Sequence, residues 1–122
     1  MRNLRHGAEI VDRWLGLSLA EQLGHVGSEV GRALKWRTRN PGIAQGALER
    51  ALELIDLTLD DPRQRSSVAR LREICRVREV LLDFLVGPNQ YGATEETLRR
   101  YFDAFGVAAI NGRTRAPTAA GS

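Results

Sequence analysis

Two dipeptides, Asn40-Pro41 and Asp61-Pro62, constrain the fold of this 122-residue chain more than any other feature. Asn and Asp cap the first turn of a helix well, and proline suits the first helical position because its ring already holds a helical φ. Proline also disrupts a helix that precedes it. Each dipeptide therefore ends one helix and begins the next after a very short connection, which predicts antiparallel neighbours.

Between these dipeptides and the other residues that begin or end helices, apolar residues recur at steps of three and four along each segment. No alternating pattern typical of a strand and no internal repeat is present. The sequence therefore predicts an all-α protein, an antiparallel four-helix bundle with a short additional N-terminal helix. The predicted bundle helices are about 18–38, 41–60, 62–86 and 94–111, and the additional helix is about 5–15. Residues 1–111 are expected to form a single domain, and residues 112–122, which lack an apolar period, a disordered tail.

Three glycines lie along one side of the predicted helix 18–38: Gly24, Gly27 and Gly31. Each glycine inside a helix costs up to about 1 kcal/mol relative to alanine. A compensating cause is needed, and close packing of a neighbouring helix provides one. We therefore expect another helix to approach this side.

The predicted helix 62–86 has apolar residues around most of its circumference, which predicts that neighbours enclose it. Cys75 falls on its apolar side and is expected to be an inert core thiol. Arg78 falls in the same arc, and an unpaired buried charge is too costly to be stable. We therefore expect a buried ion pair of Arg78 with Glu49 or Glu53, with Glu79 as a further alternative.

The formal net charge of +3 is distributed unevenly along the chain. Residues 40–61 contain one basic and five acidic residues, whereas residues 62–79 contain six basic and two acidic residues. One interpretation is that these two arms pair within one molecule, where each exposed pair contributes less than about 1 kcal/mol. The other is that the acidic arm of one subunit meets the basic arm of another.

A basic cluster marks the end of the predicted helix 18–38. It consists of Arg32, Lys35, Arg37 and Arg39, with Trp36 among them. Cations neutralise phosphates and an exposed indole can stack on a base, so this cluster is a candidate binding site for nucleic acid or for a protein partner. The same cations also favourably oppose the dipole of a helix C-terminus, which is a purely structural explanation.

Residues with catalytic or metal-binding chemistry are few. The chain has two histidines and one cysteine, and none of the common catalytic, phosphate-binding or metal-ligand motifs occurs. His25 and Glu29, one helical turn apart, could in principle hold a metal or pass a proton, but a solvated pair is the favoured explanation. The sequence thus favours no enzyme activity and no cofactor.

Composition narrows the remaining functions. With 43% hydrophobic and 27% charged residues the chain resembles ordinary globular proteins, and it lacks an apolar run long enough to cross a membrane. A lone cysteine rules out an internal disulfide and fits the cytoplasm. We therefore expect a non-catalytic helical assembly or protein-interaction module, forming a homo-oligomer or binding another protein. The alternative is an RNA- or DNA-binding accessory protein that uses the patch around Trp36, and a small enzyme or metal-binding protein comes third.

Overall fold

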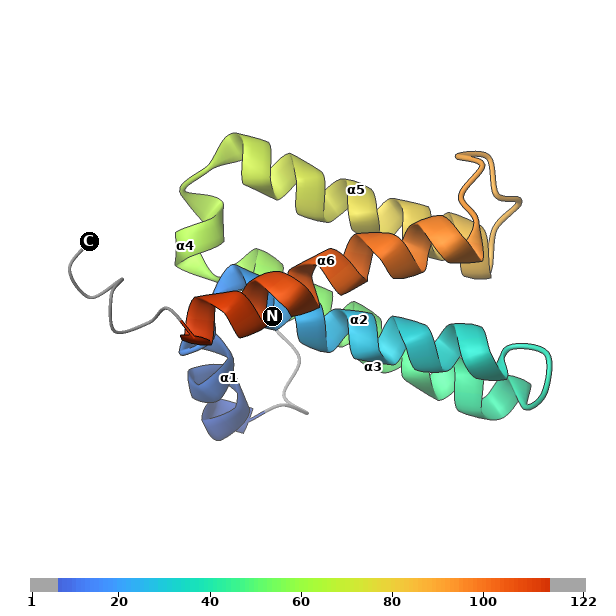
Figure 1. The fold of residues 1–122 in the computed structure, drawn as a ribbon, viewed down its shortest axis with the longest axis horizontal. Coiled ribbons are helices and arrows are strands. Elements are labelled where there is room, and N and C mark those ends of the chain that lie inside the picture. Colours follow the sequence, from blue (N-terminus) through green and yellow to red (C-terminus); the bar gives the residue numbers. More distant parts are fainter. Residues whose placement is uncertain (1–6, 115–122) are drawn as a thin grey trace.

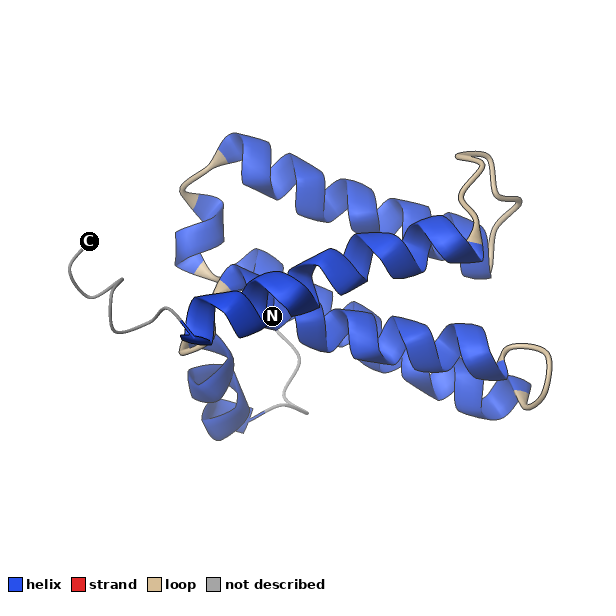
Figure 2. Ribbon diagram, viewed as in Figure 1, coloured by secondary structure: helices blue, strands red, loops and turns tan. Residues whose placement is uncertain are grey.

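The structure is a computed structural model that describes residues 7–114 of the chain. Within this range every regular element is a helix (Figure 2), which confirms the predicted all-α fold class. The helices are α1 (Gly7–Leu15), α2 (Leu19–Trp36), α3 (Pro41–Asp60), α4 (Pro62–Arg65), α5 (Val68–Leu85) and α6 (Glu95–Thr114).

Polar side chains begin the helices at the positions that the sequence indicates. The Ser18 hydroxyl accepts a hydrogen bond from the backbone N–H of Glu21, and the Glu21 carboxylate accepts one from the backbone N–H of Ser18. This reciprocal pair is a capping box, and it begins α2. Asn40 and Asp61 likewise accept backbone N–H groups in the first turns of α3 and α4. Proline follows each of these two caps, so the chain turns sharply at both ends of α3.

The core forms around α2, which packs against α3 on one side and α6 on another (Figure 1). Its apolar stripe supplies the central layer, and the two neighbouring helices cover that layer. The residues that these three helices contribute to the main buried apolar cluster are Leu23, Val26, Val30, Leu34, Leu48, Ala51, Ile55, Leu98 and Phe102.

A glycine allows the closest approach between α2 and α6. A Cβ at Gly27 would lie 2.6 Å from Cβ of Phe102, which is closer than two non-bonded carbon atoms approach each other. A Cβ at Gly31 would lie 3.7 Å from Nη1 of Arg99, an ordinary contact distance. Gly24 is half-buried in the same helix. Of Gly27 and Gly31, Gly27 is therefore the one against which α6 packs directly.

The expectation that neighbours enclose the helix at 62–86 is wrong. Ser66 and Ser67 interrupt it, so that α4 and α5 are separate helices, and only Ile74 and Leu81 of α5 are buried. The reason is that α2 and α6 pack on each other, which leaves α5 to pack mainly against α3 and α4. Figure 1 shows α5 running along one edge of the molecule, apart from α2. Its apolar circumference is thus covered on one side only.

The last helix also differs from the prediction. α6 continues to Thr114, past Asn111 and Gly112, where the sequence suggested that it ends. The predicted disordered tail therefore begins inside a helix. Residues 115–122 lie outside the described residues. The division into one domain and a tail stays a prediction.

Candidate functional site

The most exposed apolar side chains of α5 lie along one side of the helix, which we call the outer face. Val68 and the residue after the helix, Val86, are each 64% exposed, and Cys75 is also exposed. The expectation that Cys75 is a core thiol is therefore wrong. Leu71 and Leu82 of the same face are half-buried. Val68, Cys75 and Leu82 are spaced by seven residues, with Leu71 three residues after the first, which is the apolar spacing of a helix that pairs with another helix.

Charged side chains of both signs border the outer face. Arg72 and Glu79 lie on α5, seven residues apart, and both are exposed. Arg72 makes no ion pair within the part of the chain that the structure describes. Glu79 accepts a long hydrogen bond, 3.4 Å from the hydroxyl of Tyr91.

The ion pair expected for Arg78 forms with a different carboxylate. Nε of Arg78 donates to Oδ1 of Asp56 over 3.0 Å, whereas the sequence suggested Glu49 or Glu53. Asp56 lies one turn after Glu53 on α3, so it belongs to the same acidic side of that helix. The pair is only partly buried, with side-chain exposures of 35% and 29%, because α5 lies at the edge of the molecule. Its role is to join α5 to α3.

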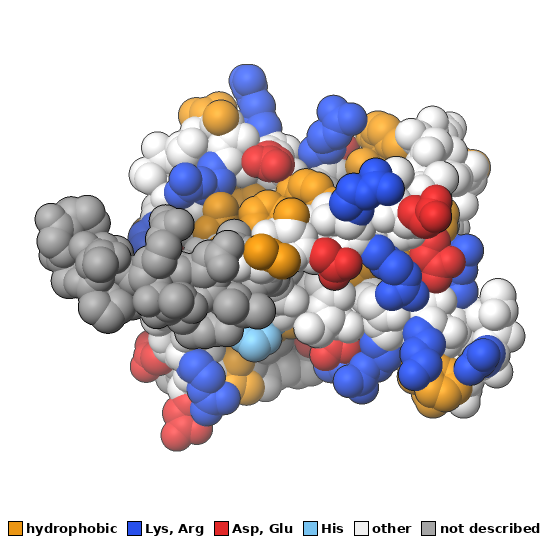
Figure 3. Space-filling view, in the orientation of Figure 1, with side chains coloured by type: hydrophobic (Ala, Val, Ile, Leu, Met, Phe, Trp, Pro, Cys, Tyr) orange, Lys and Arg blue, Asp and Glu red, His pale blue; other side chains and the backbone are white. Residues whose placement is uncertain are grey.

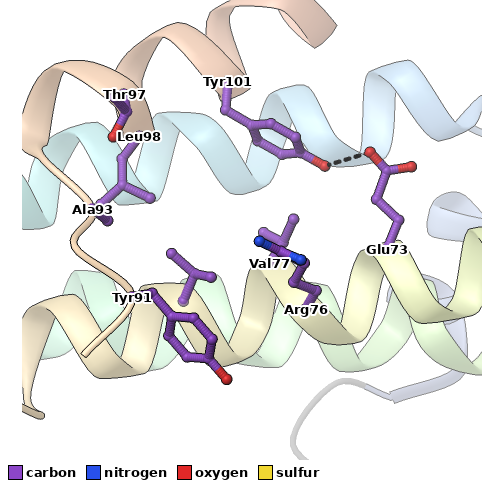
Figure 4. Close-up of a pocket in the computed structure, with 9 residues that line it drawn as sticks. Glu73, Arg76, Val77, Tyr91, Ala93, Thr97, Leu98 and Tyr101 are labelled. Atoms are coloured by element: carbon purple, nitrogen blue, oxygen red, sulfur yellow. Dashed lines mark hydrogen bonds between the residues drawn. The ribbon is translucent and has the colours of Figure 1, made fainter. Parts of the chain in front are cut away.

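A cavity of about 310 Å³ lies between α5 and α6 (Figure 4). Val77 and Val80 of α5, Leu98 of α6 and Ala93 of the loop before α6 form its apolar walls. The polar residues that line it are Glu73, Arg76, Tyr91, Thr97 and Tyr101. The cavity exists because α5 and α6 diverge, so that side chains of the two helices line a shared space without filling it.

A hydrogen bond joins α5 and α6 beside the cavity. The hydroxyl of Tyr101 donates to Oε2 of Glu73 over 3.2 Å, and Figure 4 shows this bond between the two helices. Burial of the phenol, together with the adjacent Glu73 carboxylate, raises the pKa of Tyr101 well above its usual range. Tyr101 therefore stays protonated and remains a donor across the whole physiological pH range. Arg76, the cation that lines the cavity, has no carboxylate within ion-pair distance among residues 7–114.

A buried polar network joins the turn between α1 and α2 to the turn between α3 and α4. Asp61 is fully buried, and its carboxylate accepts hydrogen bonds from Nε2 of Gln22 over 3.0 Å and from Nη2 of Arg63 over 2.6 Å. Arg63 also donates to the carbonyl oxygen of Leu17 over 2.7 Å. Hydrogen bonding to Arg63 is the main cause that lowers the pKa of Asp61 to about 2. The carboxylate is thus ionised at neutral pH.

Trp14 extends this network into α1. Its indole Nε1 donates to the hydroxyl of Thr58 over 3.1 Å, and its carbonyl oxygen accepts from Nε2 of Gln22 over 2.9 Å. Gln22 is fully buried, and its Oε1 has no hydrogen-bond partner among residues 7–114. The hydrogen bonds of Trp14 to Thr58 and to Gln22 hold α1 on α3 and on α2. This network was not predicted from the sequence, in which the Asp cap before Pro62 is its visible sign.

The five residues of the predicted basic cluster lie at the end of α2 and in the turn after it, and three of the side chains have contacts within the protein. The guanidinium of Arg37 lies 4.7 Å from the centroid of the Phe84 ring, and that of Arg32 lies 3.9 Å from Glu29. Nζ of Lys35 lies 5.4 Å from the Trp36 ring centroid, and Arg39 is exposed. Figure 3 shows basic side chains across one face, with acidic ones among them, and several basic ones close together in the region where Figure 1 places the end of α2.

The pair suggested as a metal or proton-transfer site does not form one. His25 packs against the ring of Trp14, with the centroids 5.8 Å apart, whereas Glu29 accepts a hydrogen bond from Nε of Arg50 over 3.3 Å. No group of three or more potential ligands that could hold a metal exists within residues 7–114. In the same range, no helix has the length and apolarity needed to cross a membrane.

Comparison of the chain with protein-family models, with curated proteins and with solved structures finds no match.

Proposed function

We propose that this chain is a non-catalytic protein-interaction module that forms a homodimer through the outer face of α5. The observation that carries this proposal is the row of exposed and half-buried apolar side chains at heptad spacing on a helix with only two buried residues. Helices with this spacing gain stability by packing against a second helix with the same spacing. A two-fold axis through α5 would supply that helix from an identical chain.

The positions along α5 favour an antiparallel pair centred on Cys75. In that arrangement Val68 packs against the partner's Leu82, and each Cys75 faces the partner's Cys75. Arg72 then lies beside the helical turn that holds the partner's Glu79, so opposite charges meet twice across the axis. A parallel pair would instead bring Arg72 against the partner's Arg72, which is unfavourable. Charge complementarity therefore selects the antiparallel arrangement.

The intramolecular contacts of the acidic helix α3 support this choice of surface. Asp56 is paired with Arg78 of the same chain, and Glu49 accepts a hydrogen bond from Gln45. The acidic side of α3 is thus already engaged, and it is less suited to meet the basic arm of another subunit. An exposed thiol at the centre of the interface would stay reduced in the cytoplasm, which is where we propose that the protein acts.

Replacing Val68 by glutamate is expected to weaken the dimer at least tenfold. The residue is 64% exposed, so the fold should tolerate the change, whereas the dimer loses two apolar contacts and gains two buried charges. The measurement is light scattering on a sizing column over a range of protein concentrations. Val107→Glu is the matched control, since Val107 is 58% exposed on α6, away from this face, and its replacement should leave the dimer unchanged.

Two results would contradict the proposal. One is a wild-type protein that stays monomeric at every concentration. The other is a dimer that Val68→Glu and Val107→Glu affect equally.

The absorbance ratio of the same column peak also tests the nucleic-acid alternative, because RNA or DNA that remains bound raises absorbance at the shorter wavelength. The engagement of Arg32 and Arg37 within the protein makes that alternative the weaker one.

A further inference from the structure

The cavity between α5 and α6 lies on a different side of α5 from the outer face, so the proposed dimer leaves it open. We infer that it binds a small apolar carboxylic acid, with the apolar body between the two helices and the carboxylate on Arg76. This would be a function additional to dimer formation, since none of the residues of the outer face lines the cavity.

The size of the cavity suits a ligand with one ring and a short chain. Its volume is about 310 Å³, at the lower end of the range found for small-molecule sites. A dry cavity of roughly 150 Å³ is already large enough to hold benzene. The walls formed by Val77, Val80 and Leu98 are aliphatic, and such a surface favours an apolar ligand body over a sugar or a nucleotide.

The charges around the cavity indicate an acid and not an amine. Glu73 is the carboxylate that lines the space, and it already accepts a hydrogen bond from the hydroxyl of Tyr101. Arg76 lines the same space without a carboxylate partner in the described part of the chain. A guanidinium binds a carboxylate through two parallel N–H donors, which gives both strength and orientation. Figure 4 shows the side chain of Arg76 directed into the space between α5 and α6, and that of Glu73 directed toward Tyr101.

The loop that closes one end of the cavity is held in place by its own hydrogen bonds. The carboxylate of Asp83 accepts from the backbone N–H groups of Gln90 and Tyr91 over 2.9 and 3.0 Å. The side chain of Asn89 bonds both the N–H and the carbonyl oxygen of Ala93, each over 3.0 Å. These bonds fix the backbone of Tyr91 and Ala93, the two loop residues that line the cavity. The site is therefore formed before the ligand arrives, which lowers the entropic cost of binding.

Titration calorimetry with 3-phenylpropanoate tests this inference, and the neutral 3-phenylpropanamide serves as a probe of the same shape. We expect the acid to bind at least tenfold more tightly than the amide. Arg76→Gln should remove this preference and leave the weak binding of the amide unchanged. Arg100→Gln is the matched control, because Arg100 is an exposed arginine on α6 that does not line the cavity, and its replacement should preserve the preference.

A second variant tests the location of the ligand independently of charge. Ala93→Leu adds bulk inside the cavity, and we expect it to abolish binding of both probes while circular dichroism shows the helices intact. Equal binding of acid and amide by the wild type would overturn the inference, and so would the absence of binding at millimolar concentration. Light scattering on the same samples reports the dimer separately, so failure of the dimer proposal is distinguishable from failure of this one.

Discussion

Replacing Asp61 by alanine is expected to lower the free energy of unfolding by about 3 kcal/mol, because breaking a buried charged pair from one side leaves its partners unsatisfied. Gln22 is fully buried and loses one of the two acceptors of its Nε2, and Arg63 loses its carboxylate. Arg63 is 49% exposed and can turn to water, which places the cost at the lower end of the usual range. Urea denaturation at neutral pH measures the change.

The same substitution has a pH signature that a general packing defect would not produce. The pKa of Asp61 is lowered from 3.8 to about 2, so its ionised form stabilises the fold fully above pH 4. That contribution, about 2 kcal/mol, is lost as the pH falls from 4 through 2, because the folded state must then bind a proton that the unfolded state already holds. The difference between wild type and Asp61→Ala should shrink over this interval. Asp103→Ala, at an exposed aspartate of α6, should change stability by less than about 0.5 kcal/mol.

Replacing Gly27 and Gly31 of α2 by alanine, one at a time, should change the free energy of unfolding in opposite directions. At Gly27 the new Cβ would lie 2.6 Å from Cβ of Phe102, an atom that cannot move without its backbone, so α2 and α6 must separate. Overpacking of this kind destabilises the fold by more than the higher helix propensity of alanine stabilises it. We therefore expect Gly27→Ala to lower the free energy of unfolding by about 2 kcal/mol. At Gly31 the nearest atom is the flexible end of Arg99, 3.7 Å away, and we expect a gain of about 0.5 kcal/mol.

Thermal unfolding of the two alanine variants and of the wild type under one condition shows whether each substitution stabilises or destabilises the fold. A stabilised Gly27→Ala would contradict the described packing of α6 on α2. A Gly31→Ala as destabilised as Gly27→Ala would show that helix flexibility, and not the proximity of Phe102, is what requires the glycines.

Helix positions could be predicted from this sequence because their determinants are local. Ser18, Asn40 and Asp61 act on the residues directly after them, so their capping roles are visible without knowledge of the fold. The same holds for the three- and four-residue apolar steps of α2. The all-α fold class follows from these features alone.

The surroundings of α5 could not be predicted in the same way. An apolar residue such as Cys75 or Val68 is buried only if another helix covers it. Whether one does depends on which helices pack against α2 and which are left to pack against α5. The cavity has the same origin, since it arises from the divergence of α5 and α6. The Asp61 network could not be predicted either, because Gln22 reaches Asp61 only when α2 packs on α3, and Trp14 joins only when α1 folds back onto α3. Long-range packing determined each of these features.

Oxidative cross-linking of the lone cysteine tests the central claim, an antiparallel α5 dimer, most directly. The chain has one cysteine, so any disulfide must join two chains. A second single-cysteine variant, Cys75→Ser combined with Val68→Cys, serves as the comparison. In the antiparallel arrangement its two thiols lie about 20 Å apart, at 1.5 Å per residue along the helices, which is too far for a disulfide.

The account predicts that mild oxidation converts most of the wild-type protein to a disulfide-linked dimer on a non-reducing gel, and that the variant stays monomeric on that gel. Val68→Glu, which keeps Cys75, should lose the cross-link. A wild-type protein that fails to cross-link where light scattering detects a dimer would contradict the account. Efficient cross-linking of the Val68→Cys variant would contradict it as well, since only a parallel pair brings those two positions together.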